Sequence, residues 1–305
     1  MPIKAIRLYQ IQIPFKKKFK HAAHERNAAD NIVIATETTD GKTGYGEGLA
    51  RDYVTGETTE SAIESILRLD ARIFEKRARN LEETVQFLDE EILSQKNFKK
   101  DKENNTARAA IELSILDAAC REFGKNFADV VQVLNLKNRA PNGTREVFYD
   151  GVVTLASPKK MAWTTLKLRL ARFHKIKIKT DADPEEVLEA VKIVRYAAGN
   201  TMNIRIDANG AWNLLAAKRI LNAIAPYNIS AVEQPLAREK VAEMAELRKS
   251  TQIPLMLDES LCSLNDARAA VQNKWCDIFN IRISKCGGWI NSVRIADYAA
   301  TQNKK

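Results

Sequence analysis

The sequence lacks the patterns that define several large classes of protein. Its four cysteines, Cys120, Cys262, Cys276 and Cys286, show no Cys-x-x-Cys spacing, so neither a zinc site nor a disulfide framework is indicated. No apolar run approaches 18 residues, and the N-terminal residues lack the apolar core of a signal peptide. We therefore expect a soluble cytoplasmic protein without a membrane partner.

Nucleic acid is also an unexpected partner, although the formal charge of +9 would permit it. The basic residues are spread widely, and no RNP, zinc-finger or glycine-loop motif accompanies them. DNA binding therefore remains a distant third hypothesis. The one dense patch is Lys16, Lys17, Lys18 and Lys20, followed by His21. We favour a solvated loop for this patch over a contact with an anionic substrate.

The first part of the chain predicts an α+β domain. Strand patterns cover residues 3–14, 31–37 and 43–47, with a hairpin at Asp40-Gly41. Helical patterns follow from 60 to about 93 and over 106–123, where Gly124 suits the end of a helix. We place the N-terminal domain over residues 1–125 and a linker over 126–145.

Residues 146–305 alternate between strand and helix patterns, which favours a parallel α/β arrangement. The predicted strands are 147–153, 175–179, 203–207, 229–233, 255–258 and 278–283, and helices between them include Pro184–Ala198 and Leu214–Ile224. Six strands are two fewer than the usual (β/α) barrel contains. The chain stops at Lys305, in or just after the helix that follows the sixth strand. We expect an incomplete TIM-like barrel, and truncation is the explanation that we favour.

Three acidic residues end successive predicted strands at nearly constant spacing. Asp207, Glu233 and Asp258 are separated by 26 and 25 residues, a step that suits one strand, one loop and one helix. A single acidic residue at a strand end is most often a cap for the next helix. Three in succession, at strand ends that converge in a barrel, favour a magnesium site, because this ion prefers carboxylate and water oxygens.

Lysines extend this series on both sides. Lys179 precedes Asp207 by 28 residues, and Lys285 follows Asp258 by 27. In the run from Lys175 to Lys179, lysine alternates with isoleucine, so the three lysines share one face of the strand. On an exposed strand that face would be solvated, whereas in a barrel it is the interior. Two lysines on opposite sides of a metal can remove and return a proton next to a carboxylate.

Several segments of the sequence resemble the muconate-lactonizing subgroup of the enolase superfamily. They are Gly44-Tyr45-Gly46-Glu47, Val54-Thr55-Gly56-Glu57, Ala107-Arg108-Ala109-Ala110-Ile111-Glu112, Leu116-Asp117-Ala118-Ala119, Lys177-Ile178-Lys179 and the run from Asn280 to Gly288. This subgroup contains muconate cycloisomerases, dipeptide epimerases, N-succinylamino acid racemases and o-succinylbenzoate synthases. The resemblance covers nearly the whole chain and implies an enolase-type capping domain followed by the barrel.

The resemblance also implies a role for individual residues. Asp207, Glu233 and Asp258 would bind Mg²⁺, with Mn²⁺ as the alternative ion. Lys179 and Lys285 would form the acid/base pair, and Lys177 would assist electrostatically. Asn209 and Glu259 match motif positions and are expected to support the site. Residues 16–26 and 51–57 correspond to loops that cover the substrate, although no individual substrate contact is predicted.

These observations lead to two hypotheses of different class. The first is a magnesium-dependent isomerase that removes the α-proton of a small carboxylate substrate, with racemisation or epimerisation slightly preferred over cycloisomerisation and a lyase reaction left open. The second is an inactive remnant that at most binds metal, suggested by the two missing barrel strands. Assembly into a homo-oligomer is also left open.

Overall fold

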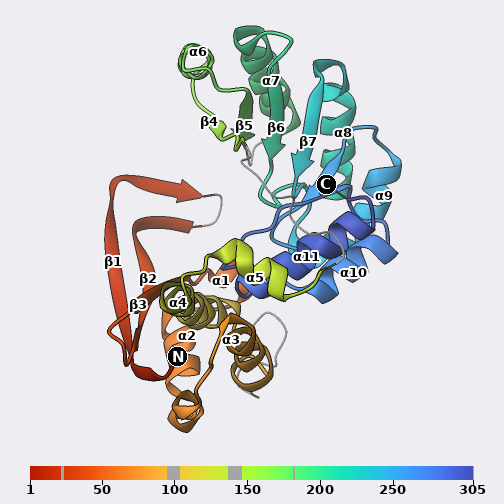
Figure 1. Ribbon diagram of the computed structural model, residues 1–305. Coiled ribbons are helices and arrows are strands. Elements are labelled where there is room, and N and C mark those ends of the chain that lie inside the picture. Colours follow the sequence, from red (N-terminus) through yellow and green to blue (C-terminus); the bar gives the residue numbers. More distant parts are fainter. Residues whose placement is uncertain (22–23, 95–103, 137–145, 181–182, 305) are drawn as a thin grey trace. The chain divides into compact units, whose positions relative to one another are not determined.

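The computed structural model describes residues 1–21, 24–94, 104–136, 146–180 and 183–304, without the side chains of 16–26 and Tyr53 (Figure 1). The chain forms two compact units. The N-terminal unit comprises Met1–Pro141, Leu261–Ala267 and Ile281–Asn303. The sheet unit comprises Asn142–Ser260, Arg268–Asn280 and Lys304–Lys305. Within the described residues, no helix has the length and apolar character needed to span a membrane.

The N-terminal unit is built on an antiparallel sheet of β1 (Ile3–His21), β2 (His24–Thr38) and β3 (Thr43–Leu49), in that order. The three predicted strands are present, and Gly41 turns the chain between β2 and β3 with φ of 79°. The strands β1 and β2 extend well beyond their predicted ends. Their pairing continues past an irregularity between Pro14 and Phe19, because backbone hydrogen bonds do not require the apolar alternation used to predict the strand.

Helices form the core of this unit together with the sheet, and α2 and α4 contact the sheet directly. They are α1 (Asp52–Thr55), α2 (Thr59–Leu67), η1 (Ala71–Glu75), α3 (Leu81–Phe87), η2 (Leu88–Ile92), α4 (Asn105–Phe123), α5 (Phe127–Val133) and α11 (Trp289–Thr301). The helix α5 lies within residues 126–145, where we expected a linker, and Asn126 caps it through a reciprocal capping box. Buried Ile32 and Ile34 of β2 share the core with Ile111 and Ile115 of α4.

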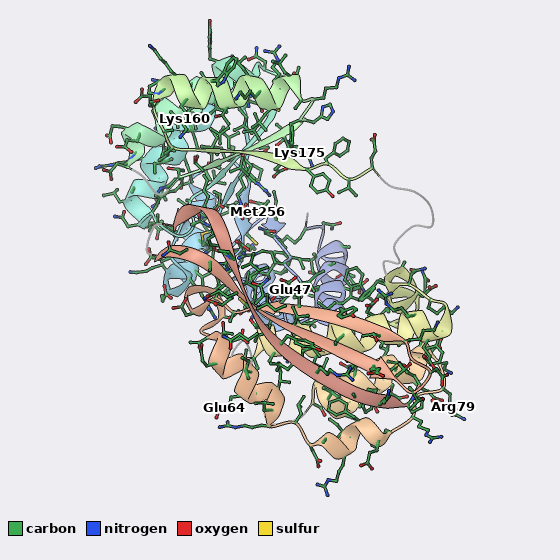
Figure 2. All side chains as sticks on the ribbon, turned by 90° about the vertical axis from the view of Figure 1, so that its left-hand side faces the viewer. Glu47, Glu64, Arg79, Lys160, Lys175 and Met256 are labelled. Carbon is green, nitrogen blue, oxygen red and sulfur yellow. The ribbon has the colours of Figure 1, made fainter. Side chains whose placement is uncertain are left out.

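The long helix α4 lies unusually close to β3. Gly44, Gly46 and Gly48 alternate along one face of β3, and a Cβ atom at Gly46 would lie 2.0 Å from the carbonyl oxygen of Ala110. A side chain at any of these positions would collide with α4, so glycine is required for this packing. The neighbouring position on the opposite face is occupied by Glu47, which Figure 2 labels. The helix is therefore held rigidly against the sheet.

The sheet unit contains six parallel strands in sequential order: β4 (Asp150–Thr154), β5 (Lys175–Lys179), β6 (Asn203–Asp207), β7 (Ile229–Glu233), β8 (Leu255–Leu257) and β9 (Ile278–Phe279). The helical segments of the connections are α6 (Pro158–Leu170), α7 (Pro184–Ala198), α8 (Leu214–Ile224), η4 (Ala225–Tyr227), η5 (Arg238–Glu243), α9 (Met244–Lys249) and α10 (Leu264–Gln272). The residues of α10 are divided between the two units. Figure 1 shows the strand–helix succession through β7 and α8. This confirms the predicted six-stranded part of a β/α barrel.

Three predicted strands of the sheet unit have different bounds in the structure, and β8 ends at Leu257, one residue earlier than predicted. The first, β4, begins at Asp150 rather than 147, because its partner β5 begins at Lys175 and the two residues pair directly. The last, β9, ends at Phe279 instead of 283, where residues 281–288 turn into the start of α11. Between these limits, Ile176, Ile178, Ile204 and Ile206 are fully buried and form the centre of the sheet unit.

Candidate active site

The register of the parallel strands brings three predicted site residues into one row. Lys179 of β5 pairs with Asp207 of β6, and Asp207 pairs with Glu233 of β7. Each residue is the last of its strand, so the three side chains lie at the carboxyl edge of the sheet. Neighbouring strands are about 4.8 Å apart. Residues from three separate strands therefore meet in one small region.

Lys177 links the two acidic members of this row. Its Nζ atom lies 2.7 Å from Asp207 Oδ2 and 3.1 Å from Glu233 Oε1. The alternation of β5 places Lys177 on the same face as Lys179, two residues nearer the start of the strand. Burial alone would lower the pKa of Lys177, but Asp207 and Glu233 outweigh this effect and raise it. Lys177 is therefore a positive charge fixed between two buried carboxylates.

Glu233 collects several further polar contacts that the sequence alone did not indicate. Asn280, which follows β9, donates from Nδ2 to Glu233 Oε1 at 2.8 Å. Arg205 Nε lies 3.5 Å from Glu233 Oε2, while its Nη2 atom donates to Asp150 Oδ2 at 2.5 Å. Arg205 lies on β6 on the same side as Asp207, two residues earlier, and this spacing is the signal that could have identified it.

Asp258 is positioned by a residue of the neighbouring strand end. The side chain of Gln234 accepts hydrogen bonds at Oε1 from the backbone nitrogens of Asp258 and Ser260, at 3.0 and 3.1 Å. Its Nε2 atom donates to Ser260 Oγ at 2.8 Å. Gln234 is fully buried and has a φ of 37°, an unusual value for a residue other than glycine. It joins the end of β7 to the segment that carries Asp258.

The two supporting residues, Asn209 and Glu259, contact each other. Asn209 donates from Nδ2 to Glu259 Oε1 at 3.3 Å, and its backbone nitrogen donates to Asp207 Oδ1 at 3.1 Å. Asn209 also has a left-handed φ of 47°, which asparagine tolerates better than most residues. The turn after β6 thus connects Asp207 to the turn after β8.

Burial and like charge set the electrostatics of this cluster. Burial raises the pKa of Glu233, and the neighbouring Asp207 and Asp258 raise it further, against the opposing effects of Lys177 and Arg205. Burial also lowers the pKa of Lys179; nearby Lys177 adds to this shift, and Asp207 opposes it. The site therefore concentrates negative charge and contains one lysine that is easier to deprotonate than usual.

The predicted metal ligands have the donor chemistry of a divalent cation site. Asp207, Glu233 and Asp258 are 2%, 0% and 4% exposed, and Glu233 Oε2 accepts no hydrogen bond from a described residue. Among the described residues, no three His, Cys, Asp or Glu side chains already form a metal-binding group; the ammonium of Lys177 lies between two of the acids instead. Buried oxygen donors with surplus negative charge fit a hard cation such as Mg²⁺.

Lys285 is the one predicted site residue that belongs to the N-terminal unit. It is buried within the segment Ile281–Asn303, just before α11. The other predicted residues, Lys177, Lys179, Asp207, Asn209, Glu233, Asp258 and Glu259, all belong to the sheet unit.

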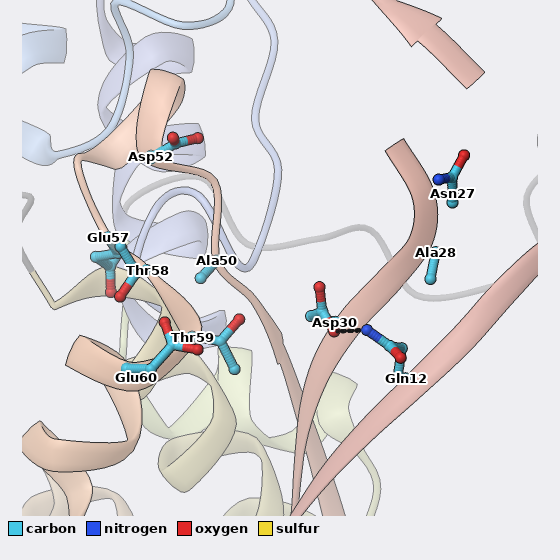
Figure 3. A pocket seen from close by; sticks show the side chains of 10 residues that line it. All are labelled: Gln12, Asn27, Ala28, Asp30, Ala50, Asp52, Glu57, Thr58, Thr59 and Glu60. Atoms are coloured by element: carbon cyan, nitrogen blue, oxygen red, sulfur yellow. Dashed lines mark hydrogen bonds between the residues drawn. The ribbon is translucent and has the colours of Figure 1, made fainter. Parts of the chain in front are cut away.

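A cavity in the N-terminal unit has a volume of about 470 Å³ (Figure 3). It is lined by Gln12, Asn27, Ala28, Asp30, Ala50, Asp52, Glu57, Thr58, Thr59 and Glu60. Gln12 Nε2 donates to Asp30 Oδ1 at 2.8 Å across the β1–β2 pair. Residues 51–57, one of the two predicted substrate-covering loops, contribute to this lining, whereas the side chains of 16–26 lie outside the description.

An α+β N-terminal domain followed by parallel β/α units, with acids and lysines at the strand ends, defines the class of enzyme that builds its active site at the carboxyl ends of barrel strands. Residues 5–131 match the mandelate racemase / muconate lactonizing enzyme N-terminal domain, and residues 161–305 match the enolase C-terminal domain-like family. The chain belongs to the enolase superfamily, within its mandelate racemase / muconate lactonizing group.

Two relatives that agree with this assignment are isomerases. The N-succinyl-L-Arg/Lys racemase of Bacillus cereus is 29% identical over 98% of this chain and 77% of its own length. The D-Ala-D/L-Ala epimerase of Cytophaga hutchinsonii is 27% identical over 97% of this chain and 76% of its own length. These relatives identify the chain as an enzyme of the isomerase type, and the alternative of an inactive remnant receives no support from them.

Solved structures give the same result for the fold. The crystal structure of the Bacillus cereus N-succinyl Arg/Lys racemase matches with a TM-score of 0.82 and 27% identity, covering 100% of this chain and 79% of that one. The dipeptide epimerase of Enterococcus faecalis, complexed with Mg and the dipeptide L-Leu-L-Tyr, matches with a TM-score of 0.81 and 26% identity, covering 100% and 81%. The predicted enolase-type architecture is thereby confirmed.

Proposed function

We propose that this protein is a magnesium-dependent racemase or epimerase that acts on the α-carbon of an N-acyl amino acid or a dipeptide. The observation that supports this most strongly is the row of Lys179, Asp207 and Glu233 at adjacent strand ends, with Lys177 paired to both acids. Removal of a weakly acidic proton requires a base and a nearby positive charge that stabilises the developing anion, and the buried carboxylates would contribute by holding the metal ion. The similarity to a racemase of N-succinyl amino acids and to a dipeptide epimerase supports the substrate class.

In this proposal, Asp207, Glu233 and Asp258 hold Mg²⁺, with Mn²⁺ as the alternative ion. A bound divalent cation would stabilise the negative charge that develops on the carboxylate oxygens of the substrate. Lys177 adds a fixed positive charge beside Asp207 and Glu233. Asn209 and Glu259 keep the turns after β6 and β8 in place through their mutual hydrogen bond.

The two remaining lysines carry the proton. Lys179 breaks the α-C–H bond by accepting the proton on its neutral amine, and Lys285 donates a different proton to the opposite face of the same carbon. The configuration inverts and no atom is gained or lost. The lowered pKa of Lys179 supports its role as a base, because a larger fraction of the amine is neutral near pH 7. In the reverse direction the two lysines exchange roles.

One relative keeps a second reaction open. The o-succinylbenzoate synthase of Bacillus subtilis is 27% identical over 97% of this chain and 74% of its own length. A synthase reaction can use the same proton-abstracting residues, so the proposed lysines do not discriminate between these reactions. Racemisation or epimerisation remains the preferred function, because it uses both lysines as proton carriers in each turnover.

The test is a substrate panel measured in heavy water with Mg²⁺ present. The panel contains N-succinyl amino acids, dipeptides and muconate, with cationic, neutral and anionic side chains among the amino acids. The range of charges is needed because relatives of this chain act on substrates that contain Arg or Lys, Glu, or hydrophobic residues. We expect deuterium to enter the α-position, and chelation of the metal to stop this exchange.

Replacement of each lysine tests whether that residue carries the exchanged α-proton. Lys179→Ala and Lys285→Ala should each abolish turnover while metal binding persists. Lys175→Ala is the matched control, because Lys175 lies on the same face of β5 at its first residue, away from the carboxyl edge (Figure 2). Wild-type exchange in both Lys179→Ala and Lys285→Ala would remove these lysines from the mechanism.

A further inference from the structure

The backbone around Lys285 is held by a side chain of α4. Asn105, the first residue of that helix, is buried and donates from Nδ2 to the carbonyl oxygen of Lys285 at 2.6 Å. The same amide group donates to the carbonyl oxygen of Cys262 at 2.9 Å. A buried amide group that satisfies two carbonyls from different segments fixes the position of both. One of the two carbonyls belongs to Lys285 itself.

A second side chain of α4 holds the helix that follows Lys285. Glu112 Oε1 accepts hydrogen bonds from the backbone nitrogens of Trp289 and Ile290, at 2.5 and 3.0 Å. These two residues begin α11, whose first N–H groups have no partner within the helix. Glu112 is fully buried. It therefore provides the cap of α11 from another element of the N-terminal unit.

Two glycines between Lys285 and α11 allow these contacts. Gly287 and Gly288 have φ angles of 79° and 116°, in the region that favours glycine. A Cβ atom at Gly287 would lie 2.6 Å from Asn105 Oδ1, and one at Gly288 would lie 2.6 Å from Glu112 Oε1. The loop is thus shaped to fit these two particular side chains.

The helix that supplies both side chains is itself fixed. Asn105 and Glu112 are seven residues apart, two helical turns, and so share one face of α4. On another side, the glycines of β3 bring the sheet against the helix backbone. At its first turn, Glu57 Oε1 accepts a hydrogen bond from the backbone nitrogen of Thr106 at 2.8 Å. The helix can therefore serve as a rigid support for the Lys285 loop.

We propose that Asn105 and Glu112 are positioning residues that set the place of the Lys285 amine for proton transfer. This inference rests on the proposed function, in which Lys285 is one of the two proton carriers. Neither residue contacts the reacting atoms; both act through the backbone that carries Lys285. A displacement of about 1 Å in a reacting group is enough to reduce a rate by about 100-fold. Loss of either contact should therefore impair the steps that use Lys285.

This role has a signature that general destabilisation does not produce. In a two-base reaction, one lysine removes the α-proton from one configuration of the substrate, and the other lysine removes it from the opposite configuration. Exchange of the substrate α-proton with heavy water, followed separately from each configuration, reports on the two lysines individually. A defect in the position of Lys285 should slow exchange from one configuration only.

The experiment compares Asn105→Ala, Glu112→Ala and Lys285→Ala in the full chain, with N-succinyl-L-arginine and N-succinyl-D-arginine or a pair of dipeptide epimers as probes. Lys285→Ala identifies the configuration that depends on Lys285. Ser114→Ala is the matched control, because Ser114 is buried on the same helix and its Oγ lies 2.8 Å from Thr36 Oγ1, away from the loop. Hydrogen–deuterium exchange of the amides of 286–290 reports on the loop independently of activity.

We expect Asn105→Ala and Glu112→Ala to slow exchange from the Lys285-dependent configuration by 10- to 100-fold, with little change in KM. The amides of 286–290 should lose protection in both variants and keep it in Ser114→Ala. Glu112→Gln, which retains the accepting Oε1, should restore most of the activity. Unchanged protection, or equal losses from both configurations, would overturn the positioning role. Wild-type exchange of the substrate α-proton in Lys285→Ala would instead overturn the proposed function, on which the positioning role rests.

Discussion

The Nζ atom of Lys177 lies 2.7 Å from Oδ2 of Asp207, and the same ammonium reaches Glu233 Oε1 at 3.1 Å. The lysine thus neutralises part of the charge that a metal ion would neutralise when bound. Because Asp207 and Glu233 are buried, this interaction is screened less by solvent than a surface ion pair. The metal and the ammonium would therefore be expected to influence each other strongly.

Replacement of Lys177 by Met should separate metal binding from turnover. Removal of a positive charge next to two proposed ligands should strengthen Mg²⁺ binding, while loss of that charge near the substrate should reduce turnover by about 10- to 1,000-fold. Thermal melting as a function of Mg²⁺ concentration measures the first effect, since binding to the folded state stabilises it. Lys175→Met is the control. Weaker Mg²⁺ binding in Lys177→Met would contradict the charge argument.

The pH dependence of turnover should report on Lys179. Since burial and nearby Lys177 lower its pKa, kcat/KM for the direction that uses Lys179 as a base should rise with pH and level off below the ordinary lysine value. In Lys177→Met the rising limb should move to higher pH, because a positive neighbour is lost. If the rising limb of the pH profile does not move in Lys177→Met, a group other than Lys179 controls the pH dependence.

Gln234 should control the metal affinity although it is not a proposed ligand. Gln234→Ala removes the acceptor for the backbone nitrogens of Asp258 and Ser260, so that Asp258 is no longer held in place. Loss of such supporting contacts typically weakens metal binding by 10- to 100-fold. Isothermal titration with Mg²⁺ provides the measurement, and circular dichroism establishes that the variant is folded. Wild-type affinity in a folded variant would refute this role.

Glu112 should make the stability of the protein depend on pH. Burial raises its pKa to about 7, against the hydrogen bonds from Ile290 and Trp289 and the charges of Arg108 and Arg294, the latter paired with Asp89. A raised carboxyl pKa means that the folded state binds the proton more tightly than the unfolded state. The stability contribution of this group is therefore largest below about pH 4.5 and falls until about pH 7.

Glu112→Gln removes this titration while keeping the hydrogen-bond acceptor. Relative to the variant, the wild-type protein should lose up to about 3 kcal/mol between pH 4.5 and 7, because one pKa unit corresponds to about 1.4 kcal/mol. Urea unfolding at a series of pH values tests this difference. A difference between the two proteins that stays constant with pH would show that the pKa of Glu112 is the same in the folded and unfolded states.

Periodicity predicted the central elements of the sheet unit well. The structure has the predicted bounds for β5, β6, β7, α7 and α8. A charged residue ends each of these strands, a proline begins α7, and an asparagine caps the start of α8. The bounds of β4 and β9 were wrong. At both places the chain continues with residues such as Phe148 and Ile283 that suit a strand, yet the neighbouring strand offers no partner.

The site residues also divide into those that the sequence could predict and those that it could not. The acids at the strand ends and the Lys-x-Lys run could be selected from spacing, since strand length and helix length fix the step between them. Gln234, Asn280 and Asn105 could not, because their importance lies in contacts with residues between 24 and 180 positions away. No local pattern records such a contact.

The sequence by itself determined which residue types stand at the strand ends and that these strands are parallel, because both follow from local periodicity and from the step between elements. The tertiary structure alone decided that Lys177 pairs with Asp207 and Glu233, that Gln234 holds the Asp258 segment, and that α4 supports the Lys285 loop. These relationships depend on strand register and on the close approach of backbones at glycine, and both are set only when distant segments pack together.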